Sequence, residues 1–226
     1  MIADLFNLFF PRTCVTCNKT LLKNEELICL FCRHQLPLTN FHLDNENTVK
    51  KVFYGRVPLV NATSLLFFYK KGITQRLLHT LKYKGKKEVS SYLGSWIATE
   101  LEDTNWIADI DVIIPVPLHK KRLKERGYNQ VEGFGRALAN HFSIPYENNV
   151  LIKKSATRTQ VFKGRLARAV IKPHHFSLQQ EEKITGKHIL LVDDIVTTGA
   201  TLETCASILQ ASPNIKISIA TMAITI

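Results

Sequence analysis

The stretch HILLVDDIVTTGATL, residues 188–202, constrains the fold of this chain more than any other segment. Four consecutive apolar residues, 189–192, run into two adjacent acids, and a loop of threonine and glycine then leads into a helical pattern. An uninterrupted apolar run of this kind is typical of a strand that is buried on both faces of a parallel sheet. A buried strand that leads through a short polar loop into a helix is a unit of an α/β domain.

The rest of the chain supports this fold class. Apolar runs predict strands at 60–69, 111–116, 174–178, 188–192 and 215–226, the last as one strand or two. Apolar residues at helical spacing predict helices over 74–83, 89–101, 131–142 and 200–210, the third capped by Asn129. The polar segment 41–50 is expected to be a linker. We therefore predict a mostly parallel sheet with flanking helices.

The acids and the loop that follows them predict a ligand site. Ligands of open α/β sheets bind beyond the carboxyl ends of the strands, where Asp193 and Asp194 lie. Because strand side chains alternate between faces, we expect the chain to leave the strand at Asp194 if both acids serve one ligand. The small residues of the loop suit an anion at a helix N-terminus: Thr197, Thr198, Gly199, Ala200 and Thr201. A sugar phosphate accompanied by Mg²⁺ fits this arrangement. The alternative is a capped strand, loop and helix with solvated acids.

Other phosphate motifs do not match this stretch. A Walker A loop and a three-glycine dinucleotide fingerprint are absent from it. A phosphoacceptor aspartate pair, as in response-regulator receivers, is expected near the start of a chain instead. These comparisons favour a site for a phosphorylated sugar.

Four of the five cysteines form two Cys-x-x-Cys pairs, separated by eleven residues: Cys14, Cys17, Cys29 and Cys32. Two such pairs predict a structural four-cysteine zinc site. Two disulfides are the alternative, but they need an oxidising compartment, and nothing in the sequence signals export. Cys205 follows the apolar spacing of the last predicted helix, and we expect it to be a core residue.

The composition favours a polyanionic partner. The formal net charge is +11 and the calculated pI is about 9.5. The alternative is that the basic residues only keep the surface soluble. No apolar run is long enough to span a membrane, and Asp4 and the lack of a basic leader argue against a signal peptide. We expect a cytoplasmic protein whose apolar first residues pack on the fold.

Several motifs in this order resemble a known family. A four-cysteine segment is followed by LLHTLKYKGKKEV, then IPVPLHKKRLKERGYNQ, then ILLVDDIVTTGAT. The last motif resembles the signature of type I phosphoribosyltransferases, which bind phosphoribosyl pyrophosphate (PRPP). The whole series resembles the ComF family, which includes ComFC and GntX. This resemblance implies a zinc ribbon over residues 1–45, a phosphoribosyltransferase-like domain over 46–226, and a role in the uptake of transforming DNA.

The resemblance also implies roles for individual residues. Asp193 and Asp194 would accept hydrogen bonds from the ribose hydroxyls and steady the positive ribose of the transition state, and the loop 197–201 would bind the 5′-phosphate. The pyrophosphate side would be formed by Pro117, Leu118, His119, Arg122 and Arg126, with Asn129 and Gln130 nearby. The alternative for the two arginines is an exposed basic helix start. Because this fold also serves PRPP sensors, whether the chain is an enzyme stays open.

One segment departs from the family pattern. In TRTQVFKGRLARAVIKPHHF, Lys163, Ala167 and Ile171 stand where leucine, glutamate and asparagine are usual. In enzymes of this fold the corresponding segment is often a mobile loop over the active site. The departures leave ligand specificity open and make the segment more basic.

Basic residues interleaved with aromatic ones predict a second ligand, single-stranded DNA. Phosphate contacts combined with base stacking on Tyr83 or Tyr128 would bind it, although both tyrosines also fit the edge of a core. The candidate contacts are Lys82, Tyr83, Lys84, Lys86, Lys87, Lys121, Arg158, Lys163, Arg165 and Arg168. A third hypothesis is a scaffold that docks a DNA-translocation partner such as a helicase.

Overall fold

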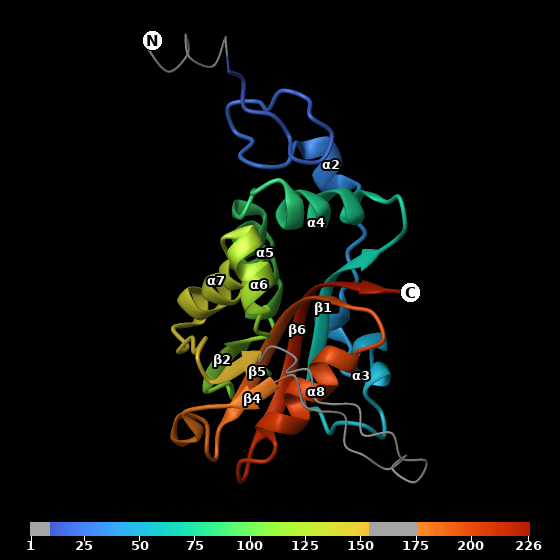
Figure 1. Cartoon of the computed structure of the whole chain (residues 1–226). Coiled ribbons are helices and arrows are strands. Elements are labelled where there is room, and N and C mark those ends of the chain that lie inside the picture. The colour runs from blue at the N-terminus through green and yellow to red at the C-terminus, as the bar shows by residue number, and fades with distance from the viewer. Residues whose placement is uncertain (1–9, 154–175) are drawn as a thin grey trace, which may run out of the picture.

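The computed structural model describes residues 10–153 and 176–226, and its centre is a parallel sheet (Figure 1). In spatial order the strands of this sheet are β1 (Ala62–Phe68), β6 (Lys216–Thr225), β5 (His188–Val196) and β2 (Val112–Pro115). Every neighbouring pair is parallel. A small antiparallel ribbon joins β3 (Leu151–Lys153) to β4 (Phe176–Leu178). The α/β fold class is confirmed.

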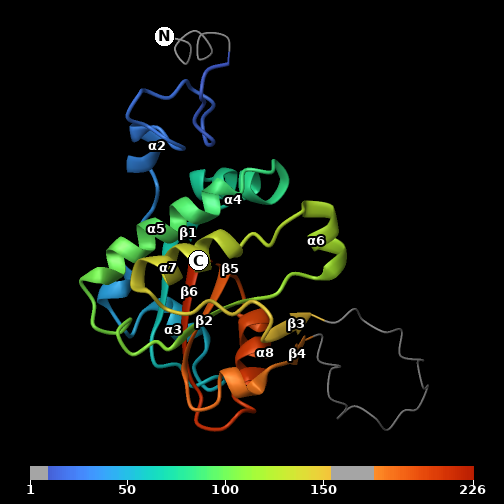
Figure 2. The same cartoon turned by 90° about the vertical axis from the view of Figure 1, so that its left-hand side faces the viewer.

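Helices cover both faces of the sheet (Figures 1 and 2). Leu190 and Val192 pack in a core with α4 (Ile73–Tyr83), α5 (Glu88–Glu102) and α7 (Glu132–Phe142). Ile189 and Leu191 point to the other face and pack against α8 (Ala200–Leu209) and α3 (Thr48–Val52). This double burial explains the uninterrupted apolar run. No helix among the described residues is long and apolar enough to cross a membrane.

The predicted third helix begins later than expected. Its N-cap residue is Val131 and has no side-chain cap, so Asn129 is not the cap. Instead, Asn129 Oδ1 accepts from the Val131 backbone N–H at 3.2 Å, and Nδ2 donates to the Val116 carbonyl at 3.1 Å. Asn129 therefore stabilises the turn that precedes the helix and ties it to the loop after β2.

The segment that carries the four paired cysteines, residues 10–40, is called the cysteine segment and packs directly on the larger domain. It contains α2 (Leu30–His34) and lies above α4 in Figure 1. Leu21, Ile28 and Leu36 share one continuous apolar core with Leu77 and Leu81 of α4. A hydrogen bond from Thr80 Oγ1 to the Val15 carbonyl, 3.2 Å long, crosses the junction.

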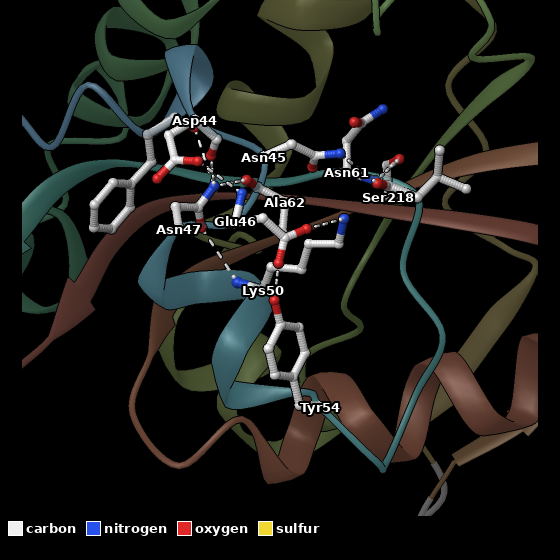
Figure 3. Close-up of polar contacts among 11 residues, drawn as sticks. Asp44, Asn45, Glu46, Asn47, Lys50, Tyr54, Asn61, Ala62 and Ser218 are labelled. Carbon is white, nitrogen blue, oxygen red and sulfur yellow. Dashed lines mark hydrogen bonds and ion pairs between the residues drawn. The ribbon is translucent and has the colours of Figure 1, made fainter.

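The segment expected to be a linker is folded, so that prediction is wrong. It forms a 3₁₀ turn, η1 (Phe41–Leu43), and helix α3, which both pack against β1. Asn47, only 3% exposed, organises this connection (Figure 3). Its Nδ2 donates to the carbonyls of Phe41, Asp44 and Ala62 at 3.1, 2.6 and 2.7 Å. Its Oδ1 caps α3 by accepting from the Lys50 N–H at 3.2 Å.

We expect Asn47→Ala to lower the free energy of unfolding by about 2–4 kcal/mol, because it removes a helix cap and leaves buried carbonyls without a donor. Chemical denaturation measures this change. Asn45→Ala is the matched control, since Asn45 is exposed and its Nδ2 donates to one carbonyl within the described residues, that of Val60 at 3.2 Å. Equal losses for the two variants would contradict the role given to Asn47.

Candidate functional site

The acid pair lies within strand β5. The chain does not leave the strand at Asp194 as expected, because pairing with β6 continues from Asp193 with Thr221 to Ile195 with Ala223. The two acids are 8% and 6% exposed. Both nevertheless line one cavity of about 190 Å³ at the carboxyl end of the sheet. Adjacent side chains of a strand point to opposite faces of the sheet, so Asp193 and Asp194 line this cavity from opposite faces of β5.

Asp194 is held by residues from the α4 and α7 side of the sheet. Lys82 Nζ lies 2.7 Å from Asp194 Oδ2, and Gln130 Nε2 donates to the same oxygen at 3.1 Å. Arg126 donates in turn to Gln130 Oε1. Lys82, expected among the DNA contacts, thus lies inside the acid site, and Gln130 links Arg126 to it.

Asp193 lies in a less compensated environment. Burial, reinforced by the negative charge of Asp194, raises the pKa of Asp193 from 3.8 to about 8, against the opposing charges of Lys82 and Lys153. Its Oδ1 accepts from the Asp194 backbone N–H at 2.8 Å. Two adjacent buried carboxyl groups of this kind suit a ligand that brings hydroxyl donors or a cation.

This raised pKa predicts a pH-dependent effect of Asp193→Asn on stability. The folded state favours the neutral carboxyl, so wild type carries no penalty below the unfolded value of 3.8 and the full penalty above about 8. Asparagine is neutral throughout. We therefore expect the variant to gain stability relative to wild type as the pH rises through this window, measured by denaturation at about pH 5 and about pH 9. An equal difference at both pH values would contradict the shift.

The threonine loop turns from β5 into α8. Gly199 has φ +76°, and a Cβ at this position would lie 2.8 Å from Val52 Cγ1 and 3.0 Å from Phe53 Cε1. Thr197, Thr198 and Thr201 are exposed. Arg56 stabilises the loop, because its Nη1 donates to the Thr198 carbonyl at 3.2 Å and to the Glu203 carboxylate at 2.9 Å. The glycine thus permits both the backbone conformation and the close approach of α3 and Phe53.

We expect Gly199→Ala to cost about 2–3 kcal/mol of stability, since it adds a steric clash to the cost of a positive φ. Denaturant midpoints measure the loss. Gly55→Ala is the control, because Gly55 has a similar φ of +70° and nothing within 4 Å of the added Cβ. It should lose only about 1 kcal/mol. If the two losses match, the packing of the loop is not as described.

The predicted pyrophosphate side borders the same cavity in part. Pro117, Leu118, Arg122 and Arg126 line it together with the acids and Thr201. His119 is not among the lining residues, and its Nδ1 instead caps α6 (Lys120–Arg126) by accepting from the Lys121 N–H at 3.2 Å. Lys153, which was not predicted as a site residue, also lines the cavity from β3. No local motif marks this lysine, because its place depends on how the β3–β4 ribbon packs.

A second cavity of about 450 Å³ adjoins the first and shares Lys82, Tyr83, Arg122 and Arg126 with it. Tyr83 is 70% exposed, and the Arg126 guanidinium lies 5.8 Å from its ring centre. Tyr128 also lines this second cavity, while its hydroxyl donates to the Leu81 carbonyl and its ring packs against the core.

The other predicted DNA contacts divide into two groups. The exposed ones are Lys84, Lys86, Lys87 and Lys121. The remaining four lie outside the described residues: Arg158, Lys163, Arg165 and Arg168. The rest of the segment that departs from the family pattern, up to residue 175, and the apolar residues 1–9 also lie outside them.

The four paired cysteines converge. The sulfur atoms of Cys14, Cys17, Cys29 and Cys32 all lie within 4.8 Å of one another. All are free thiols, and the Cys29 backbone N–H donates to Cys14 Sγ at 3.4 Å. Four sulfur ligands at this spacing can hold a metal ion. Cys205 is fully buried on the core-facing side of α8, as expected.

Comparisons with known proteins agree with this geometry. A family model described as "Phosphoribosyl transferase domain" matches residues 132–223. Competence protein F of Haemophilus influenzae is 34% identical over 212 residues, which cover 89% of this chain and 92% of that protein. DNA utilization protein YhgH of Escherichia coli O157:H7 is 28% identical over 87% of this chain and 83% of its own. Competence protein ComFC of Bacillus subtilis is 26% identical over 82% and 79%. The chain belongs to the ComF family of competence proteins and contains its phosphoribosyltransferase-type domain.

Proposed function

We propose that the cavity at the end of β5 binds PRPP together with Mg²⁺. The observation that carries this proposal is one cavity lined by two buried acids, two arginines and Thr201 in the first turn of α8. A phosphorylated pentose needs acceptors for its hydroxyls and donors for its phosphates, and this cavity offers both.

Each part of the ligand has a partner in this proposal. Backbone N–H groups and hydroxyls of residues 197–201 hold the 5′-phosphate at the N-terminus of α8. Asp193 and Asp194 accept hydrogen bonds from the ribose hydroxyls. Arg122 and Arg126, with the loop 117–119, bind the pyrophosphate. The adjacent carboxyl groups of Asp193 and Asp194 also fit a divalent cation, which would offset the charge of the pyrophosphate.

Two activities are compatible with such a complex. In a phosphoribosyltransferase, the acids would steady positive charge on the ribose while the arginines hold the departing pyrophosphate. In a PRPP sensor, binding occurs without turnover. The ion pair between Lys82 and Asp194 favours the sensor, because it neutralises one acid before the ligand arrives. Release of pyrophosphate from PRPP in the presence of candidate acceptors identifies the enzyme.

Isothermal titration tests the binding proposal. We expect saturable heat on titrating PRPP with Mg²⁺ into the full chain. Ribose 5-phosphate should bind more weakly, because it lacks the pyrophosphate that Arg122 and Arg126 contact in this proposal. PRPP that gives no heat under these conditions would refute it.

The four-cysteine cluster is proposed to hold one structural zinc ion. Its four sulfur ligands fill a tetrahedral site and leave no position open for chemistry. The ion would stabilise a segment whose own apolar core is small and continuous with that of α4. We place the boundary of this zinc-ribbon module near residue 45, with the phosphoribosyltransferase-like domain following it.

The second proposed ligand is single-stranded DNA, in a protein that acts in the cytoplasm during natural transformation. Relatives named competence proteins, the net charge of +11 and the exposed Tyr83 beside Arg126 support this proposal. Fluorescence anisotropy with a labelled oligothymidylate should show affinity that falls steeply as salt rises. Affinity that is flat in salt would favour the alternative, a scaffold that docks a partner such as a helicase.

A further inference from the structure

A cavity of about 360 Å³ lies at the junction of the cysteine segment and helix α4. It lies away from the acid pair and shares no lining residue with the cavity that contains it. One wall is formed by Thr16, between the first two cysteines, and by Asn18, which follows the second. The other wall is formed by α4 and the residues beside its two ends, and it includes Lys71, Arg76, His79 and Lys84. Nothing in the family motifs of the sequence marks this junction.

The charge of this cavity is one-sided. Lys71, Arg76 and Lys84 are exposed, and none of them forms an ion pair within the described part of the chain. No aspartate or glutamate is among the described residues that line the cavity. The cavity between the cysteine segment and α5 differs, since Glu26, Glu88 and Glu100 line it together with Arg33. A concave surface with three uncompensated cations suits an anion.

The wall also contains a buried hydroxyl. Thr16 is 6% exposed, and its Oγ1 is buried and has no hydrogen-bond partner among the described residues, so it lies behind the surface of the cavity. The ligand contacts therefore come from the three cations, and a phosphate has enough oxygens to contact all of them.

The exposed face of α4 connects this cavity with the site already described. Arg76, His79 and Tyr83 are spaced by three and four residues, so they follow one another along one face of the helix. The rings of His79 and Tyr83 lie 4.8 Å apart. Tyr83 lines the second cavity beside Arg126, which adjoins the acid pair. A charged pocket followed by aromatic rings is an arrangement that binds single-stranded nucleic acid.

We propose that the cavity between the cysteine segment and α4 binds a backbone phosphate of single-stranded DNA, and that the face formed by Arg76, His79 and Tyr83 leads the strand toward the acid site. This inference rests on the proposed binding of DNA and adds to it the place where a phosphate is held. It also places the cysteine segment beside the bound strand, because Thr16 and Asn18 line the cavity.

Two variants of the full chain test this proposal by anisotropy with a labelled oligothymidylate. Arg76→Glu should weaken DNA binding about tenfold or more and reduce the salt slope by about one. Lys71→Glu reverses a second exposed cation of the same cavity, so it should also weaken binding severalfold. Both variants should retain the zinc content and the PRPP heats of wild type.

The control is Lys51→Glu, which reverses a charge at an exposed position on α3. Its DNA affinity should stay within about twofold of wild type. Wild-type protein that does not bind the oligonucleotide would refute the proposed DNA function itself. Wild-type protein that binds, with Arg76→Glu no weaker than Lys51→Glu, would overturn this inference alone.

Discussion

Replacing Asp193 and Asp194 together by asparagine is expected to lower the affinity for PRPP with Mg²⁺ by about a hundredfold or more. Each acid is buried and faces the proposed ribose position, and hydrogen bonds to charged groups contribute about 1.5–3 kcal/mol each. Asparagine keeps the shape but cannot become the carboxylate that a divalent metal favours. Isothermal titration of both proteins with PRPP and Mg²⁺ measures the difference.

The control for the acid pair removes two negative charges elsewhere. Asp103 and Glu182 are exposed, and Asp103→Asn combined with Glu182→Gln should leave the binding heat unchanged. Circular dichroism and denaturation show whether each variant remains folded. Equal affinities of wild type and the Asp193→Asn/Asp194→Asn variant would remove the acids from the site and reject the proposed mode of binding.

The second large effect is expected on loss of the metal. The purified protein should contain about one zinc ion per chain, and Cys32→Ser should abolish this content and unfold the cysteine segment. Structural zinc sites contribute apparent binding energies of about 10–16 kcal/mol, which exceeds what so small an apolar core supplies. Metal analysis gives the stoichiometry, and limited proteolysis reports unfolding between residues 10 and 40.

Cys205→Ser separates the loss of a ligand from the loss of a buried thiol. Cys205 is as buried as Cys32 but belongs to α8, so the variant should lose some stability and keep its zinc. Zinc retained at full stoichiometry by Cys32→Ser, or absent from wild type, would contradict the proposed zinc site.

The elements of the fold were predictable because their signals are local. The apolar run 189–192 and the spacing of Leu77, Leu78 and Leu81 depend only on which side chains a strand or helix buries. The folded structure of segment 41–50 was not predictable, because it depends on the hydrogen bond from Asn47 to the Ala62 carbonyl, fifteen residues away. The strand continues past Asp194 for a similar reason, since β6 remains paired beside it.

The candidate site was predictable where one motif carries it. The acids and the loop 197–201 come from a single stretch of sequence. Arg122 and Arg126 come from a second motif and line the same cavity, but supporting residues that no motif marks were not recognised. Arg56 reaches the Thr198 carbonyl across 142 positions, and Lys82 reaches Asp194 from the end of α4. Such contacts follow from the packing of whole elements, which residue patterns do not specify.

A crystal structure of the full chain with PRPP and Mg²⁺ tests the central claim most directly. We predict density for the 5′-phosphate against the backbone of residues 197–201, for the ribose beside Asp193 and Asp194, and for the pyrophosphate toward Arg122 and Arg126. A complex in which this cavity stays empty, or in which the ligand lies with its phosphate away from the start of α8, would contradict the account.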